Sequence, residues 1–260
     1  MPPETTTDRI AVHGIEMEVL RLGAGAPVLF LHGFHPARRD ARFLELLGRR
    51  MQVIAPCHPG FGGTPRPKDF ESVYDLLHLY GQLIETLGHP RVSLIGSSFG
   101  GWLAAELALR MPSRIDRLVL VDSLGIKVSG RETPDILDIF NLHPDKVRAA
   151  TWHDPRHAPD YDAMEDEALI ALHRGREALS LYGWHPYMHH PRLAYWLPAI
   201  KATTLVLWGA SDGIVKPAYG KAMARLIPGA QFAQIAEAGH HPEIEQPDAF
   251  ADHVTGFLSC

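Results

Sequence analysis

The chain has 260 residues, 46% of them hydrophobic and 21% charged, which suits one large α/β core or a core with a small insert. Its net charge of −5 and the lack of any run of lysines and arginines argue against a nucleic-acid-binding protein. No signal peptide is visible, and no apolar run reaches the length of a membrane span. We therefore expect a cytoplasmic protein with no membrane partner.

Cysteine is sparse in the sequence. Cys57 and Cys260 permit one disulfide bond, but two cysteines in a chain of this length fit a reducing compartment better. No pattern calls for a cofactor, so we expect none. The sequence leaves open whether the chain forms a homo-oligomer.

The N-terminal third of the chain predicts strands and one helix. Residues 9–23 alternate between apolar and polar and predict a hairpin of two edge strands that turns at His13-Gly14. Apolar, β-branched runs predict two further strands, the second followed by a loop rich in glycine and proline. Leucines at helical spacing predict a helix that stops at Gly88. These three elements occupy residues 27–34, 51–64 and 72–88.

Residues 91–110 place two adjacent serines between a predicted strand and a predicted helix. The apolar run that begins at Arg91 stops at Gly96, and a stretch rich in alanine and leucine follows. A serine between two glycines, in a Gly-x-Ser-x-Gly frame, can sit on a tight, strained turn with its hydroxyl exposed. Only Ser98 fits this frame. A purely structural turn of small residues is the alternative.

The rest of the chain continues the alternation of strands and helices, except for one long segment. A strand is predicted at 115–123, a strand followed by a loop at each of 203–215 and 230–241, and helices at 218–229 and 247–258. The alternation predicts an α/β fold with a mostly parallel central sheet and helices on both faces.

The segment 124–197 breaks the alternation. It has no buried-strand run, and its apolar residues recur at helical spacing in pieces separated by prolines, at 133–140, 144–151 and 162–183. It is too long for a loop. We expect a helical cap inserted after the sixth core strand, with the core formed by 1–123 and 198–260.

A serine nucleophile needs a base, an acid that orients the base, and donors for the oxyanion. In a parallel sheet these groups come from loops at the carboxyl ends of strands. Asp212 follows one predicted strand and His240 follows the next. The order Ser98, Asp212, His240 is the one expected of the fold that carries a serine on such a turn.

Five motifs in this order resemble those of the α/β-hydrolase family, and the resemblance covers nearly the whole chain. They are LHGF, PGFGGT, GSSFGG, WGASDGIV and GHHPEIEQPDAF. The resemblance implies that Ser98 attacks a carbonyl, that His240 moves its proton and that Asp212 orients His240. It also implies that the backbone N–H groups of Phe34 and Phe99 form the oxyanion hole.

Other residues compete for these roles. His241 is a rival for the base, but the family pattern leaves one residue between histidine and proline, which selects His240. Asp122, at the end of a predicted strand, is a rival acid or a local hydrogen-bonding group. His32 is expected to brace the loops beside the oxyanion hole. Cys57 occupies a position where many relatives carry an acid, and we expect a small buried side chain there.

The cap contains histidine and aromatic residues that either line the substrate pocket or pack the cap on the core. These are Trp152, His153, Tyr182, Trp184, Tyr187 and His189. His185 and His189 lie four residues apart, as metal ligands on a helix do. Pro186 follows at once and no carboxylate is near, so we expect no metal.

The serine at the turn favours an esterase that works through an acyl-serine on a small to medium apolar or aromatic substrate. An aspartate would stand there in a haloalkane dehalogenase or an epoxide hydrolase. A hydrolase of carbon–carbon bonds in ring-cleavage products is the alternative. Such enzymes often carry extra glycines after His-Gly and an asparagine before the serine, where this chain has Phe34 and Ser97. A non-catalytic ligand-binding protein is a second alternative, because fold does not fix function.

Overall fold

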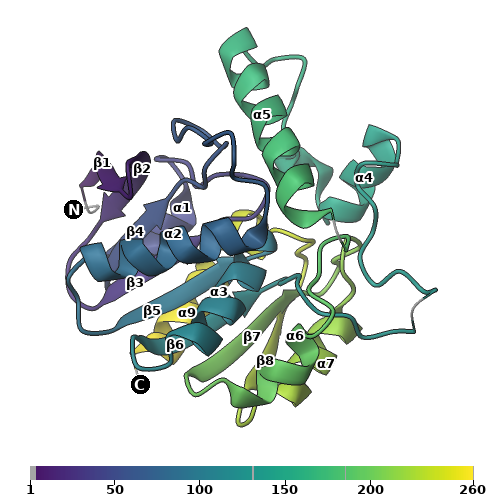
Figure 1. Ribbon diagram of the computed structural model, residues 1–260. Helices are drawn as coiled ribbons and strands as arrows, with labels where there is room; N and C mark the ends of the chain where they lie inside the picture. Colours follow the sequence, from purple (N-terminus) through teal and green to yellow (C-terminus); the bar gives the residue numbers. More distant parts are fainter. Residues whose placement is uncertain (1–3, 131, 185, 260) are drawn as a thin grey trace.

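The computed structural model describes residues 4–130, 132–184 and 186–259, and its described strands form one sheet in the order β1-β2-β4-β3-β5-β6-β7-β8 (Figure 1). The strands are β1 (Thr5–Val12), β2 (Ile15–Leu22), β3 (Pro27–Leu31), β4 (Gln52–Pro56), β5 (Val92–Ser97), β6 (Ile115–Val121), β7 (Thr203–Gly209) and β8 (Gln231–Ile235). The helices are α1 (Arg42–Gly48), α2 (Val73–Thr86), α3 (Phe99–Arg110), α4 (Pro144–Thr151), α5 (Asp166–Gly183), α6 (Leu193–Trp196), α7 (Pro217–Leu226), α8 (Pro242–Glu245) and α9 (Pro247–Leu258), with short 3₁₀ turns η1 (Pro155–His157) and η2 (Leu197–Ala199).

The predicted hairpin is present, with one difference in its place. β1 and β2 pair antiparallel around His13 and Gly14, which both have a positive φ, as a two-residue hairpin turn requires. β2 also pairs with β4 on its other side, so only β1 is an edge strand. The sequence could not show this, because the partner strand lies 30 residues further along.

The six strands from β3 to β8 run parallel, and helices cover both faces of the sheet. The alternating side chains of the strands enter two separate cores. Leu94 packs in the core that contains α2, α3 and α7, and its neighbour Ile95 packs in the core that contains α1 and α9. The predicted fold class is therefore confirmed. All six carboxyl ends lie at one edge of the sheet, where ligands bind in such folds.

Two local predictions differ from the structure. Helix α1 was not predicted, because its seven residues are too few to show a clear period and no side chain caps its first turn. The segment 133–140 was expected to be helical and is not. Instead, Ile136 forms a β-bridge with Val215, and the Leu137 N–H donates to the Ile214 carbonyl at 2.9 Å.

The segment between β6 and β7 carries α4 and α5, which lie beyond the carboxyl edge of the sheet (Figure 1). α6 and η2, at the end of the same segment, lie against α3 and α7 instead. The limits of the cap, 124–197, stay a prediction. Among the described residues, no helix is both long and apolar enough to span a bilayer. Cys57 is a free, buried thiol, and Cys260 lies outside the described residues.

The turn between β5 and α3 crosses closely over the end of β3. We therefore predict that any side chain at Gly100 strongly lowers the stability of the protein. A Cβ there would collide with the backbone carbonyls of Leu31 and His32. We expect Gly100→Ala to lower the free energy of unfolding by several kcal/mol. As a control, Gly256→Ala, on the exposed face of α9 with open space for a Cβ, should raise it by up to about 1 kcal/mol. Urea denaturation of both variants measures the difference, and equal stabilities would contradict the proposed crossing.

Candidate active site

Ser98 occupies the turn between β5 and α3 in a conformation that few residues adopt. Its φ is 54° and its ψ is −117°. The turn is held by its backbone, because the Ser98 N–H donates to the Val121 carbonyl at 2.8 Å and the Ser98 carbonyl accepts from Gly101 and Leu124. A Cβ at Gly96 would collide with the Gly100 backbone, so the flanking glycines allow the strand and helix to approach. This strained backbone directs the hydroxyl away from the sheet.

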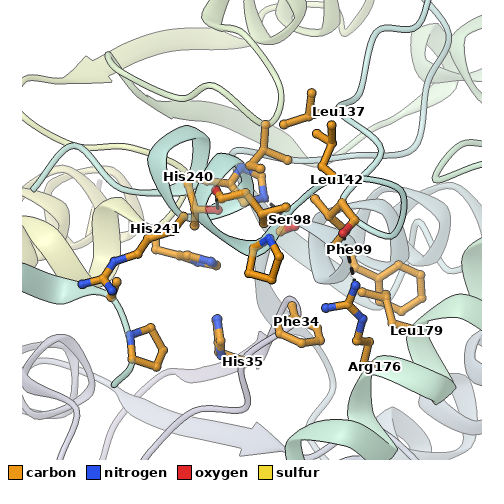
Figure 2. Close-up of a pocket in the computed structure, with 18 of the residues that line it drawn as sticks. Phe34, His35, Ser98, Phe99, Leu137, Leu142, Arg176, Leu179, His240 and His241 are labelled. Atoms are coloured by element: carbon orange, nitrogen blue, oxygen red, sulfur yellow. Dashed lines mark hydrogen bonds between the residues drawn. The ribbon is translucent and has the colours of Figure 1, made fainter. Parts of the chain in front are cut away.

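Three side chains from separate loops form a continuous hydrogen-bonded chain. His240 Nε2 lies 2.8 Å from Ser98 Oγ, and His240 Nδ1 lies 2.8 Å from Asp212 Oδ2 (Figure 2). A carboxylate can only accept, so Nδ1 carries the proton and Nε2 is free to accept the hydroxyl proton of Ser98. All three residues are at most 5% exposed. The arrangement can activate a serine for attack on a carbonyl carbon.

Asp212 and His240 are each fixed by backbone hydrogen bonds. Asp212 Oδ1 accepts from the N–H groups of Ile214 and Val215 at 2.8 and 3.0 Å, which leaves Oδ2 for the imidazole. The His240 N–H donates at 2.7 Å to the carbonyl of Thr151, the last residue of α4. The segment inserted after β6 therefore takes part in positioning the histidine.

The two rival residues, Asp122 and His241, do not take the places of Asp212 and His240 in the hydrogen bonds to Ser98. Asp122 is buried and accepts from the Gly209 N–H at 3.0 Å, and burial and then the nearby Asp212 raise its pKa well above the ordinary value. Asp122 therefore lies beside Asp212 and does not replace it as the partner of His240. The Nδ1 atom of His241 lies 3.4 Å from Glu243 Oε1, on a different carboxyl group from the one that holds His240.

The backbone N–H groups predicted to bind an oxyanion lie on either side of Ser98. Phe99 is the first residue of α3, so its N–H has no acceptor within the helix. The loop that carries Phe34 packs closely on the serine, since a Cβ at Gly33 would lie 2.8 Å from the Ser98 Cβ. Their role as oxyanion donors stays a prediction.

His32 and His58 support this loop through a reciprocal pair of hydrogen bonds. The His58 N–H donates to His32 Nε2 at 2.9 Å, and His58 Nε2 donates to the His32 carbonyl at 2.8 Å. Tyr80 completes the chain with a hydrogen bond to His58 Nδ1. Burial lowers the pKa of His58 to about 4 and that of His32 well below the ordinary value, so both rings are neutral. The bracing role expected of His32 agrees with these contacts.

Glu243 links the neighbours of the nucleophile and of the base. Its Oε1 accepts from the hydroxyl of Ser97 at 2.9 Å and lies 3.4 Å from His241 Nδ1. Its Oε2 is buried without a hydrogen-bond partner. The sequence analysis did not single out this residue, because a glutamate four positions before the proline that begins α9 has no distinctive spacing.

A cavity of about 350 Å³ opens above Ser98 and has two chemically different sides. Figure 2 shows His35 and His241 on one side of Ser98, and Leu142, Leu179 and Arg176 on the other. The Arg176 guanidinium is already engaged, because it donates to the Ile139 carbonyl at 3.2 Å and lies over the ring of Phe140.

The six cap residues proposed for the pocket divide into two groups. Trp152 and Tyr187 line the cavity. The other four lie outside its lining: Tyr182 is buried against Phe99 and donates to the Pro59 carbonyl, Trp184 is 45% exposed, and His153 and His189 are hydrogen-bonded to Ser211 and to the Tyr187 carbonyl. Whether Trp152 and Tyr187 contact substrate stays a prediction.

Most of the cavity wall was missed by the sequence analysis. α5 contributes Leu169, Leu172, Arg176 and Leu179, spaced by three or four residues along one face, and α4 contributes Val147 and Arg148. The helical period of α5 is a signal that could have identified this face. The sequence analysis considered histidine and aromatic residues instead, although the lining contains more aliphatic than aromatic side chains.

Metal binding by the cap histidines is not tested, because His185 lies outside the described residues. Within the described part of the chain, the ligand atoms of Asp122, Asp212 and His240 lie within 4.8 Å of one another. Hydrogen bonds among these groups and from the backbone already account for that closeness.

A model of the alpha/beta hydrolase family matches residues 28–253 of this chain. The chain belongs to the alpha/beta hydrolase family. The match includes the serine turn and the loops that carry Asp212 and His240, so the resemblance of the five motifs is confirmed as a family relationship. Hydrolase activity is what this family membership supports.

Three known proteins illustrate the range of relatives of this hydrolase. It is 28% identical to a 2-hydroxy-6-oxo-2,4-heptadienoate hydrolase of Pseudomonas putida, over 95% of this chain and 94% of the relative. It is 29% identical to a 2-hydroxymuconate semialdehyde hydrolase of a Pseudomonas species, over 99% and 95% of the two chains. The solved structure of a thermophilic esterase from Thermogutta terrifontis has a TM-score of 0.74 at 26% identity and covers 98% of both chains.

The assembled serine predicts selective labelling. Treatment with a fluorophosphonate should give one adduct, on Ser98, because its hydroxyl is hydrogen-bonded to an imidazole that a buried carboxylate orients. His240→Ala should slow labelling by at least about a thousandfold. Intact mass and peptide mapping measure both results. A well-folded protein that stays unlabelled would favour the non-catalytic binding protein.

The buried histidine pair predicts a loss of stability in acid. The unfolded chain takes up a proton at His58 as the pH falls below about 6.5, whereas the folded chain resists it down to about 4. The free energy of unfolding should therefore fall on going from pH 7.5 to pH 5, with about 2 kcal/mol of the fall due to His58. Urea denaturation should show a smaller fall in His58→Asn, and an unchanged one in the exposed His253→Asn.

Proposed function

We propose that this protein is a serine hydrolase that cleaves the carbon–carbon bond next to the 6-oxo group of a 2-hydroxy-6-oxodienoate. The hydrogen bond between Ser98 Oγ and His240 Nε2, at the mouth of a two-sided cavity, is the observation that carries the hydrolytic chemistry. The choice of bond draws on the curated relatives, two of which are named for substrates of this kind.

The first half of the reaction transfers an acyl group to Ser98. His240 Nε2 takes the hydroxyl proton while Oγ forms a bond to the 6-oxo carbon, and the oxyanion accepts from the N–H groups of Phe34 and Phe99. The carbon–carbon bond then breaks, its electron pair leaves with the dienoate fragment, and His240 returns the proton to that carbon. Ketonisation beforehand moves the 2-hydroxyl proton to C5 and leaves a 2-oxo-3-ene, so that the electron pair released at C5 is delocalised through the C3=C4 double bond onto the 2-oxo oxygen.

The second half releases the acyl group with water. His240 takes a proton from the water, the hydroxide adds to the acyl carbon, and Ser98 leaves with the proton that His240 carries. Asp212 stabilises the charged imidazole in both halves.

The two sides of the cavity suit the two ends of such a substrate. The aliphatic side suits the apolar acyl part, and the side with His35 and His241 suits the polar dienoate end. Arg148 lines the cavity one helical turn before Trp152, whose ring lies 5.1 Å from that of His241. Arg148 donates to the Pro155 carbonyl at 3.0 Å, and its remaining N–H groups are our candidate partner for the substrate carboxylate.

Ester hydrolysis through the same acyl-serine is the second candidate. Phe34 and Ser97 stand where carbon–carbon hydrolases often carry a glycine and an asparagine, and both positions lie against the nucleophile. Ester cleavage needs no conjugated leaving group, so it makes smaller demands on the polar side. The esterase among the structural relatives is consistent with this reading.

Steady-state assays with two substrates separate the candidates. We expect kcat/KM for 2-hydroxy-6-oxohepta-2,4-dienoate, followed by the loss of its dienol absorbance, to exceed that for 4-nitrophenyl butyrate at least about tenfold, or about 1.4 kcal/mol. Ser98→Ala should abolish turnover of both. The reverse preference would identify an esterase, and turnover that persists in Ser98→Ala would refute the acyl-serine mechanism.

A further inference from the structure

Two histidines beside His240 have no part in the hydrolytic steps. The ring centroids of His35 and His241 lie 5.3 Å apart at an interplanar angle of 68°, and His241 lies 5.2 Å from His240. Both rings line the cavity, on the side of Ser98 away from the aliphatic residues (Figure 2). Histidine pairs of this kind are costly to bury unless their nitrogen atoms have partners.

The hydrogen bonding of His241 leaves one nitrogen facing the cavity. His241 is 4% exposed, and its Nδ1 is directed at Glu243 Oε1. With Nδ1 donating to Oε1, which also accepts from the hydroxyl of Ser97, Nε2 is left as the acceptor of this ring. Within the described residues nothing donates to Nε2. A ligand in the cavity with an O–H or N–H group would satisfy it.

His35 supplies the complementary group. Neither of its ring nitrogens is hydrogen-bonded to any residue that the structure describes, and the ring packs against Phe34. Burial, and then the proximity of His241 and His240, lower the pKa of His35 to about 3. The ring is therefore neutral at physiological pH and offers one N–H donor and one acceptor.

We infer that His35 and His241 form a subsite for a hydroxyl group of the substrate, which donates to His241 Nε2 and accepts from the N–H of His35. Two hydrogen bonds of about 2.8 Å each can bridge rings at this separation. The inference rests on the proposed function, in which the group is the 2-hydroxyl of the dienoate. Glu243 acts as a positioning residue because it fixes which nitrogen of His241 carries the proton.

Packing alone is the competing explanation. The rings of His35 and His241 both contact Trp152, so the cluster could only fill space between the loops and the cap. Phenylalanine fills nearly the same volume as histidine but offers no nitrogen. A replacement by phenylalanine therefore keeps the packing and removes the hydrogen bond, which separates the two explanations.

Ligand binding to a variant that cannot react provides the test. Ser98→Ala is titrated with 2-hydroxy-6-oxo-6-phenylhexa-2,4-dienoate and with the same compound lacking the 2-hydroxyl, and binding is followed by absorbance. We expect the hydroxylated ligand to bind about fivefold more tightly. Adding His241→Phe or His35→Phe should remove the preference, whereas His241→Gln should retain part of it.

A matched histidine outside the cavity serves as control. His153→Phe, in the same Ser98→Ala background, should keep the full preference because His153 is exposed and hydrogen-bonded to Ser211. Thermal melting checks that every variant folds. Equal binding of the two ligands, or a preference that survives both phenylalanine variants, would overturn the subsite and leave the proposed function intact.

The remaining outcomes separate the subsite from the proposed function. A hydroxyl preference that depends on His241, in an enzyme that does not turn over the dienoate, would support the subsite and refute carbon–carbon cleavage. Failure of both ligands to bind would overturn both, since the cavity would then not accept this class of compound.

Discussion

The close crossing of backbones at the β5–α3 turn is the constraint on which the rest of the structure depends. Gly96, Gly100 and Gly33 each lie where a side chain would meet backbone or the nucleophile itself. Because the turn is this tight, Ser98 is forced to a positive φ and its hydroxyl projects above the sheet edge. The loops that follow β3, β7 and β8 begin at this same edge of the sheet. The side chains and backbone N–H groups of these loops can therefore reach the Ser98 hydroxyl without distorting the strands.

A second layer of hydrogen bonds makes the site rigid. His32, His58 and Tyr80 hold the loop on one side of Ser98, and Glu243 joins Ser97 to the histidine loop on the other. These groups are buried, so the fold would lose much stability if one of them were left without a hydrogen-bond partner. Burial in the fold therefore keeps His32 and His58 neutral, and in the proposed mechanism His240 is the histidine that takes and returns protons.

The sequence predicted the parts that depend on local pattern. The strands, the serine turn and the order Ser98, Asp212, His240 follow from apolar runs, glycine spacing and chain order, and the structure brings these three side chains together. The helical period of α5 marks one face of that helix, but the cavity wall also depends on how α4 and α5 sit over the sheet, which no local pattern encodes. Tyr182 shows the difficulty, because an aromatic residue of the cap can turn into the core and donate to Pro59 instead of facing the cavity.

The attachment of the inserted segment limits how the cavity can open. The last turn of α4 accepts hydrogen bonds from both catalytic loops, from Gly213 at the Ala150 carbonyl and from His240 at the Thr151 carbonyl. A movement of α4 would therefore displace the acid and the base together. α5 has no such bonds to those loops, and its first half is largely exposed. A movement of α5 would displace the aliphatic wall that it lines and leave the hydrogen bonds of α4 to Gly213 and His240 in place.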